Sequence, residues 1–378
     1  MGRSGPGLNR GRLLAIARKE LLQLRRDRRS MWMAFVLPLL LVVMFGYAIT
    51  WDVNNIPLAA VDLDGTARSR ELVDAFRASG YFTVAARPAR VREVEPLMDR
   101  GKVRVALVIP RGFAADLGAG RTAPLQVLLD GSDANTATIA MGYTQGIVRS
   151  YSNRVALRAS GMRLPVATRS RVWFNQELAS RNMIVPGLIP VIMMIIAAML
   201  TSLTIAREWE RGTMEQLAST PVHRLEVVLG KLLPYLCIGI ADVVLASVVG
   251  VLLFHVPFRG NAALLMVLAT AFLVGALGLG MFISAVARSQ VLATQMAMVA
   301  TFLPAFLLSG FMFSIDVMPA PLQAISLLVP ARYFLVVTRG IFLKGVGVHV
   351  LLLQGLLMLA FAAAGLALAT RAFRKELR

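Results

Sequence analysis

The fold is decided by one charged stretch, Arg207-Glu208-Trp209-Glu210-Arg211-Gly212-Thr213-Met214-Glu215-Gln216-Leu217-Ala218-Ser219-Thr220-Pro221, which separates two long apolar segments. The segment before it, residues 182–206, has no charged residue, and the segment after it, residues 232–257, has only Asp242. Because charges are costly inside a bilayer, a charged stretch between two apolar spans must lie in water or against another protein. It therefore indicates a membrane bundle with a polar element at one end.

The spacing of the charges predicts a short amphipathic helix over residues 207–218. Glu208, Arg211 and Glu215 are three and four positions apart, which places them on one helical face. Gly212 lowers helix stability and permits close approach of another backbone. The face is therefore suited to contact a partner, whereas the alternative is a charged linker without one.

The composition is that of an integral membrane protein. Of 378 residues, 57% are hydrophobic and 16% charged, which excludes a soluble globular or a disordered chain. Many of the basic residues behind the net charge of +19 flank apolar runs, as they do beside anionic lipid. No zinc-finger spacing or aromatic-rich basic groove occurs, so we expect membrane lipid and no nucleic acid as a partner. The single cysteine, Cys237, excludes an intrachain disulfide.

Hydropathy predicts an α-helical integral membrane protein with six transmembrane helices. The predicted spans are residues 31–50, 182–206, 225–254, 261–287, 291–313 and 348–370. Residues 1–30 are strongly basic and predict a cytoplasmic amphipathic interfacial helix, or alternatively a solvated basic tail. The tail 371–378 is also basic, so both termini are predicted to be cytoplasmic. Residues 317–331 are apolar, rich in proline and too short to cross, which predicts an outer re-entrant segment.

Residues 51–181 predict an α/β domain outside the membrane. Four strand-like runs alternate with helix-like segments; the runs are residues 58–61, 81–85, 103–109 and 125–129, and the segments are 66–79, 92–100, 113–117 and 134–159. The Asp and Gly residues at 62–65 and 130–133 are typical of strand-to-helix turns, and a metal site is the weaker interpretation.

The motifs for ATP hydrolysis and nucleophilic catalysis are absent. No G-x-x-x-x-G-K-[ST] phosphate loop occurs, so the chain itself is not expected to be a conventional ATPase. The three histidines form no recognisable triad, and we predict no catalytic residue, no metal and no cofactor bound by this chain.

Asp242 lies deep in a predicted span, where an ionisable group is costly and functional by default. It is predicted to bind a cationic substrate or a proton, or alternatively to make a structural contact with a neighbouring helix. Glu226 and Lys231 lie near the cytoplasmic end of the same span and are predicted to satisfy each other or lipid headgroups.

The stretch 207–221 resembles the signature of the ABC type-2 transporter permeases, and residues 171–186 resemble the branch with a large extracytoplasmic domain after the first span. The resemblance implies that residues 207–218 are a coupling helix docked on an ATP-binding subunit, which holds the ATP and Mg. The residues implied in coupling are Arg207, Glu208, Glu210, Arg211, Gly212 and Glu215.

Residues 303–310 resemble span five of that family. The resemblance implies a translocation pathway lined by Pro304, Phe306 and Phe311, to which we add Asp242; ordinary lipid-facing aromatic residues are the alternative. It also implies a homo- or heterodimer with a second permease subunit in the bacterial inner membrane. Members of this branch resemble multidrug efflux permeases, some of which work with a periplasmic adaptor protein.

We therefore expect the permease subunit of an ATP-driven exporter of drug-like or hydrophobic compounds. Two alternatives stay open. One is an ion-coupled secondary transporter that uses Asp242, and the other is a membrane scaffold or receptor that acts through residues 52–180.

Overall fold

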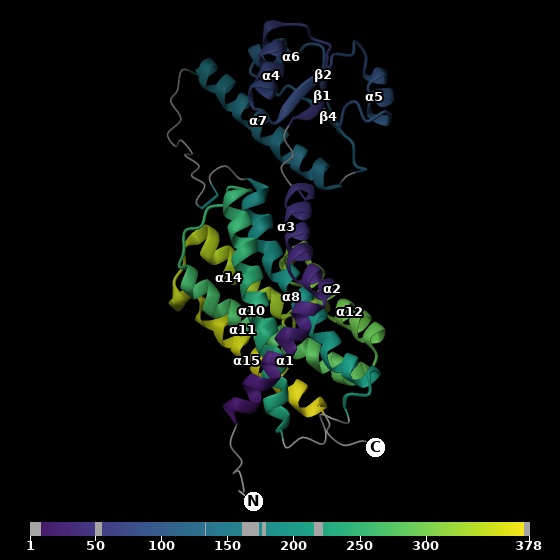
Figure 1. Cartoon of the computed structure of the whole chain (residues 1–378). Coiled ribbons are helices and arrows are strands. Elements are labelled where there is room, and N and C mark those ends of the chain that lie inside the picture. The colour runs from purple at the N-terminus through teal and green to yellow at the C-terminus, as the bar shows by residue number, and fades with distance from the viewer. Residues whose placement is uncertain are drawn as a thin grey trace, which may run out of the picture. The chain divides into compact units, whose positions relative to one another are not determined.

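The computed structural model describes residues 9–49, 55–132, 134–160, 174–175, 179–214 and 222–373. Its contacts divide the chain into two units (Figure 1). Met1–Thr50 and Val172–Arg378 form a helical unit, and Trp51–Arg171 form a second unit, against a predicted boundary at residue 181.

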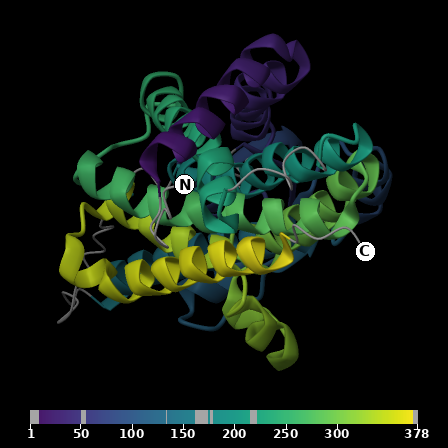
Figure 2. The same ribbon diagram turned by 60° about the horizontal axis from the view of Figure 1, so that its bottom comes forward.

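The helical unit is built around α8. Its helices are α1 (Arg10–Arg26), α2 (Arg28–Met31), the π-helix η1 (Trp32–Val36), α3 (Leu37–Ala48), α8 (Ser180–Glu210), α10 (Arg224–Leu252), α11 (Ala262–Ala287), α12 (Gln290–Leu308), η3 (Ile315–Val317), α13 (Ala320–Ser326), α14 (Pro330–Arg339), the π-helix η4 (Gly340–Lys344) and α15 (Val348–Ala372). Helices α3, α10, α11, α12 and α14 all pack on α8. Helices α1 (purple) and α15 (yellow) lie on opposite sides of the unit (Figure 2).

Small residues and hydroxyl groups bring α11 close to its neighbours. The Thr201 hydroxyl on α8 donates to the Leu277 carbonyl at 2.9 Å, and the Ser284 hydroxyl oxygen accepts the Ile205 and Ala206 amides at 3.0 and 2.9 Å. These bonds satisfy polar groups where water is absent.

Five described helices are long and apolar enough to cross a membrane: α8, α10, α11, α12 and α15. The count reaches six if the bent pair formed by α13 and α14–η4 is one span. The predicted first span, residues 31–50, is the shorter apolar helix Trp32–Ala48, which reaches only about 25 Å at the α-helical rise. The six-span count therefore stays a prediction.

Two predicted boundaries at the far end of the bundle are wrong. The predicted fifth span continued to residue 313, but α12 ends at Leu308 and the chain turns at Gly310, where φ is +85°. The segment predicted as re-entrant, 317–331, is part of a longer pair, Ala320–Ser326 and Pro330–Lys344, bent by 78°, which forms either a broken span or a re-entrant loop. Arg332 and Arg339 lower the mean hydropathy of the second helix of this pair, so hydropathy alone does not predict that helix.

The second unit has a four-stranded sheet in the order β2-β1-β3-β4. The strands β1 (Ile56–Asp62), β2 (Phe82–Ala86), β3 (Val105–Ile109) and β4 (Gln126–Leu129) overlap the predicted runs. Strand β1 pairs in parallel with β2 and β3, and β4 is antiparallel to β3. Its helices are α4 (Ala67–Ala78), the 3₁₀ turn η2 (Val91–Glu93), α5 (Glu95–Asp99), α6 (Phe113–Gly118) and α7 (Ala134–Ser160). Helices α4, α6 and α7 cover one sheet face, and η2 with α5 the other.

Asp62 and Asp64 organise the turn after β1. Asp62 accepts the Asp64 and Gly65 amides at 3.1 and 2.9 Å, and Asp64 accepts the Gly112 amide at 2.8 Å. The Thr66 hydroxyl, with help from backbone amides, holds the pKa of the exposed Asp64 carboxyl below its usual value. These bonds give both carboxylates a structural role in the turn.

We expect Gly278→Val to destabilise the helical unit. A Cβ at Gly278 would lie 2.6 Å from the Gly365 carbonyl carbon on α15, and backbone on a packed helix cannot move aside cheaply. Overpacking of this kind costs roughly 1–3 kcal/mol. Thermal unfolding of the detergent-extracted protein measures the loss. Gly146→Val on α7 is the control, since nothing lies within 4 Å of its Cβ position; equal melting temperatures in the two variants would contradict the packing argument.

Candidate functional site

The ammonium of Lys231 is buried at one end of the helical unit, between carboxylates from two other helices. Its Nζ lies 2.9 Å from Glu208 Oε1 on α8 and 3.2 Å from Glu20 Oε2 on α1, and its side chain is only 2% exposed. The Tyr235 hydroxyl donates to Glu20 Oε1 at 3.1 Å. These four residues, here called the ion cluster, join α1, α8 and α10 by charge-assisted hydrogen bonds.

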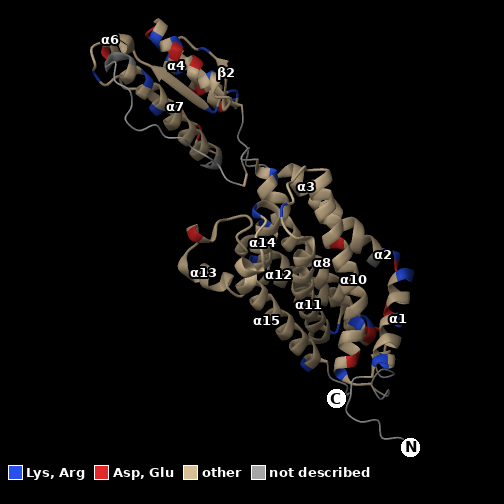
Figure 3. Cartoon of the chain, turned by 90° about the vertical axis from the view of Figure 1, so that its left-hand side faces the viewer, with Lys and Arg blue, Asp and Glu red and all other residues tan. Residues whose placement is uncertain are grey.

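Further contacts around the ion cluster fix α1 on the bundle. Lys19, which is 56% exposed, reaches Glu208 at 3.3 Å, and Arg207 reaches Asp27 at 3.1 Å. Helix α1 packs on α10 so closely that a Cβ at Gly230 would lie 2.9 Å from Ile16 Cβ. We call this end, with α1, the C-terminal turn of α8 and the first turn of α10, the basic end. Charged residues gather along its ribbon (Figure 3).

The predicted amphipathicity of α1 is only partly right. The sequence predicts that Leu13, Leu14, Ala17, Leu21 and Leu24 share one apolar arc. Ala17 and Leu24 are buried, but Leu14 and Leu21 are 59% and 47% exposed, and Glu20 is buried with its charge paired. One side of the helix therefore faces protein rather than lipid.

The predicted pairing of Glu226 with Lys231 is wrong. Glu226 accepts the Asn9 amide at 2.7 Å and the His223 amide at 2.9 Å, and so caps the starts of α1 and α10. Lys231 lies five positions further along α10, where its ammonium meets Glu20 and Glu208 instead. A five-residue separation places two side chains on different helical faces, whereas three or four would place them on one.

The charged stretch begins as the last turn of α8 rather than as a separate helix. Helix α8 continues through Arg207 to Glu210, and the chain turns at Gly212, where φ is +68° and glycine is favoured. Glu208 points into the bundle and is 5% exposed, so the predicted common face with Arg211 is wrong in this turn. Glu215 and the rest of the predicted helix lie outside the described residues.

Glu210 and Arg211 take different directions at the end of α8. Glu210 accepts the backbone amide of Gln290 at 2.7 Å and also its side-chain amide, which holds the start of α12. Arg211 is exposed. The coupling roles of these residues stay predictions.

The predicted pathway residues do not form one group. Asp242 on α10 is 2% exposed, and neither carboxylate oxygen has a hydrogen-bond partner within the described chain. Pro304 and Phe306 lie in α12, whereas Phe311 follows its end. The Phe306 ring lies 5.7 Å from that of Phe311 and 6.4 Å from that of Phe45 on α3. Their roles in translocation stay predictions.

Sequence reasoning missed Glu20, Tyr235 and the true partners of Lys231. The sequence does contain an indication of these ion pairs. Glu20 and Asp27 are the only acidic residues among the first thirty, and both form ion pairs in the structure. An isolated acid in a basic helix and an isolated lysine in an apolar one indicate a long-range pair.

The apolar helices of membrane-crossing length and the charged residues at their ends define a multi-pass membrane protein. A model of the family described as ABC-2 family transporter protein matches residues 28–371, and the chain belongs to that family.

Relatives of similar length carry transport names. The probable multidrug ABC transporter permease YbhS of Escherichia coli (strain K12) is 38% identical over 361 residues, covering 95% of this chain and 96% of YbhS. The probable multidrug ABC transporter permease YbhR of the same organism is 32% identical, covering 88% and 90%. Its inner membrane transport permease YhhJ is 27% identical, covering 86% and 87%.

We expect Lys231→Met to lower the stability of the folded protein by roughly 3–5 kcal/mol, because it leaves the buried Glu20 without a cation and the buried Glu208 with only the exposed Lys19. Lys19→Met removes an exposed partner of the same Glu208 and should cost at most about 1 kcal/mol. The melting temperature of the purified protein compares them. The triple variant Lys231→Met with Glu20→Gln and Glu208→Gln should recover part of the loss; no recovery would argue against an electrostatic cause.

Proposed function

We propose that the chain is the permease subunit of an ABC exporter, powered by ATP hydrolysis on a separate subunit that holds the ATP and Mg. The observation that carries the proposal is the ion cluster, which ties the charged stretch at the end of α8 to α1 and α10. A partner that pushes on this stretch would therefore move three helices together. The absence of a phosphate-loop motif in this chain agrees with a separate ATPase.

The residues of the charged stretch up to Glu210 and those from Arg211 onward have different proposed roles: the former contact this chain, and the latter contact a partner. Arg207, Glu208 and Glu210 bind Asp27, Lys231 and Gln290 within the chain, and so fix the end of α8. Arg211 is exposed, and it and Glu215 are the residues we assign to contact with the ATPase. Helix α8 has 31 residues, about 46 Å at the α-helical rise, and so carries a displacement across the whole bundle.

The substrate class follows from the relatives. YbhS and YbhR are named probable multidrug permeases, so we assign to this chain the export of drug-like or hydrophobic compounds. It would work in the bacterial inner membrane with cytoplasmic termini, paired with a second permease subunit. The α/β unit would lie outside the cytoplasm, where an adaptor protein could meet it.

We predict that Arg211→Glu lowers the substrate-stimulated ATPase activity of the assembled transporter by at least about tenfold, because like charges at a docking surface repel. Arg25→Glu makes the same charge change on the exposed side of α1 and should leave the stimulation within about twofold. Vanadate-sensitive phosphate release from reconstituted complexes measures both. Equal stimulation in the two variants would remove Arg211 from the docking surface.

Asp242 supports a second candidate, ion-coupled transport without an ATPase. A buried carboxylate without a protein partner is costly, so a cation or a proton must compensate it. Vanadate separates the two candidates, because it blocks an ATP-driven exporter and leaves an ion-driven one active.

If Asp242 binds cations, Asp242→Asn should reduce export of a cationic substrate by about tenfold or more and spare a neutral one of the same shape, because Asn retains the size and loses the charge. Export of the matched pair is compared at equal membrane abundance. If Asp242 has a structural role, Asp242→Leu should instead reduce the amount of folded protein. Wild-type export of both substrates by Asp242→Asn would exclude the role.

A further inference from the structure

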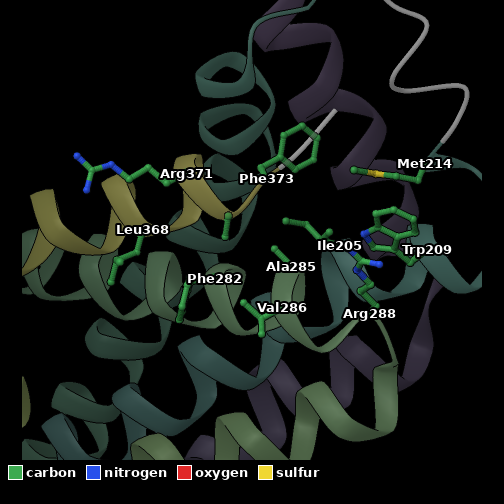
Figure 4. A pocket seen from close by; sticks show the side chains of 11 residues that line it. Ile205, Trp209, Met214, Phe282, Ala285, Val286, Arg288, Leu368, Arg371 and Phe373 are labelled. Atoms are coloured by element: carbon green, nitrogen blue, oxygen red, sulfur yellow. The ribbon is translucent and has the colours of Figure 1, made fainter. Parts of the chain in front are cut away.

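A second feature of the basic end lies on the other side of the α8 terminus from the ion cluster. It is a cavity of about 450 Å³ between α8, α11 and α15 (Figure 4). Eleven residues line it; two are arginines, none is acidic, and most of the others are apolar. Arg288 and Trp209 lie on one side of the cavity and Arg371 with Leu368 on the other, with Ile205 and Ala285 between them.

In the part of the chain that the structure describes, the two arginines have no acidic partner. Arg288 caps α11 in the left-handed conformation, with φ at +55°, and its guanidinium carbon lies 4.8 Å from the centre of the Trp209 ring. Arg371 lies in the last turn of α15. Neither side chain forms a salt bridge within the described residues. Each stands at a helix C-terminus, where the backbone carbonyls favour a cation, and each can still bind an anion.

The wall of the cavity continues into the surface that would face lipid. Val286 on α11 is 54% exposed and Leu368 on α15 is 41% exposed, and both helices are long and apolar enough to cross a membrane. The cavity therefore combines cationic groups at the helix ends with exposed apolar side chains near the end of each helix. That order of charge and apolar surface matches a phospholipid, with its phosphate at the membrane surface and its acyl chain below.

We propose that this cavity binds an anionic phospholipid from the adjoining leaflet. Arg288, beside Trp209, takes the phosphate, and Arg371, whose guanidinium points away from the cavity in Figure 4, adds positive charge at the opposite rim. Val286 and Leu368 contact an acyl chain. Basic pockets between transmembrane helices are suited to anionic headgroups, which the surface potential concentrates there. A free phosphate would leave the exposed apolar side chains of Val286 and Leu368 unused.

The site adjoins the charged stretch directly. Trp209 belongs to the last turn of α8, and Met214, which is 4% exposed, closes the cavity from beyond the turn at Gly212. A bound lipid therefore contacts the segment through which we expect the ATPase subunit to act, although the proposed binding does not depend on that function.

The test measures lipid binding directly by native mass spectrometry of the full-length protein, with phosphatidylglycerol and phosphatidylcholine supplied in equal amounts. We expect phosphatidylglycerol to bind preferentially, and Arg288→Asn with Arg371→Gln to weaken it by about tenfold, since each basic residue near a membrane contributes to anionic binding. Asn suits the left-handed backbone at Arg288. Ala285→Trp keeps both charges but fills the cavity, and should also weaken binding.

Arg18→Gln with Arg25→Gln is the matched control, because it removes two exposed arginines of the same end outside the cavity and should change binding by less than about twofold. Equal binding of the two lipids, or wild-type binding by both cavity variants, would overturn the proposal. Displacement of the lipid by millimolar inorganic phosphate would reduce the site to a phosphate site. Variants that retain the lipid but lose the ATPase subunit would identify a protein docking surface instead.

Discussion

The helical unit depends on the burial of one ammonium between two carboxylates from distant parts of the chain. Lys231 and Glu208 are 23 residues apart, and Lys231 and Glu20 are 211 apart. Desolvating such groups costs several kcal/mol per ion, so the cluster contributes little net stability but strongly disfavours any arrangement that separates its members. It therefore fixes where α1 lies on the bundle, a position that hydrophobic contacts alone would specify only loosely because α1 is amphipathic and short.

The parts of the fold that follow from local patterns could be predicted from the sequence. Strands β1 and β4 end at the predicted Asp and Gly turns, and β2 and β3 also overlap predicted runs. Helices α8, α10, α11 and α15 lie where the chain is apolar and charge is sparse. Helix α14 was missed because Arg332 and Arg339 break its hydropathy. Arg339 Nε donates to the Met183 carbonyl at 3.3 Å, so a bond across 156 residues makes a charge acceptable that the local pattern excludes.

The candidate site was less predictable because its chemistry is long-range. The sequence identified the charged stretch, but it assigned Glu208 to an outer face and paired Lys231 with Glu226. The first prediction expected a partner protein, and the second a neighbour on the same helix or a lipid headgroup, whereas both charges are paired by other helices of this chain. In a membrane bundle a charge near a helix end is instead paired by whichever neighbour reaches the same depth, and that depends on tertiary packing.

The last turn of α8 explains why this stretch is charged on every side. Four consecutive residues contact four different neighbours: Arg207 binds Asp27 beyond α1, Glu208 binds Lys231 on α10, Trp209 stacks with Arg288 after α11, and Glu210 binds Gln290 at the start of α12. Of these four residues only Glu210 is exposed, and its carboxylate already accepts the Gln290 amides. Under the proposed function, we therefore assign contact with the ATPase to Arg211 and the residues after it. The turn before them would distribute any displacement among the helices that meet there.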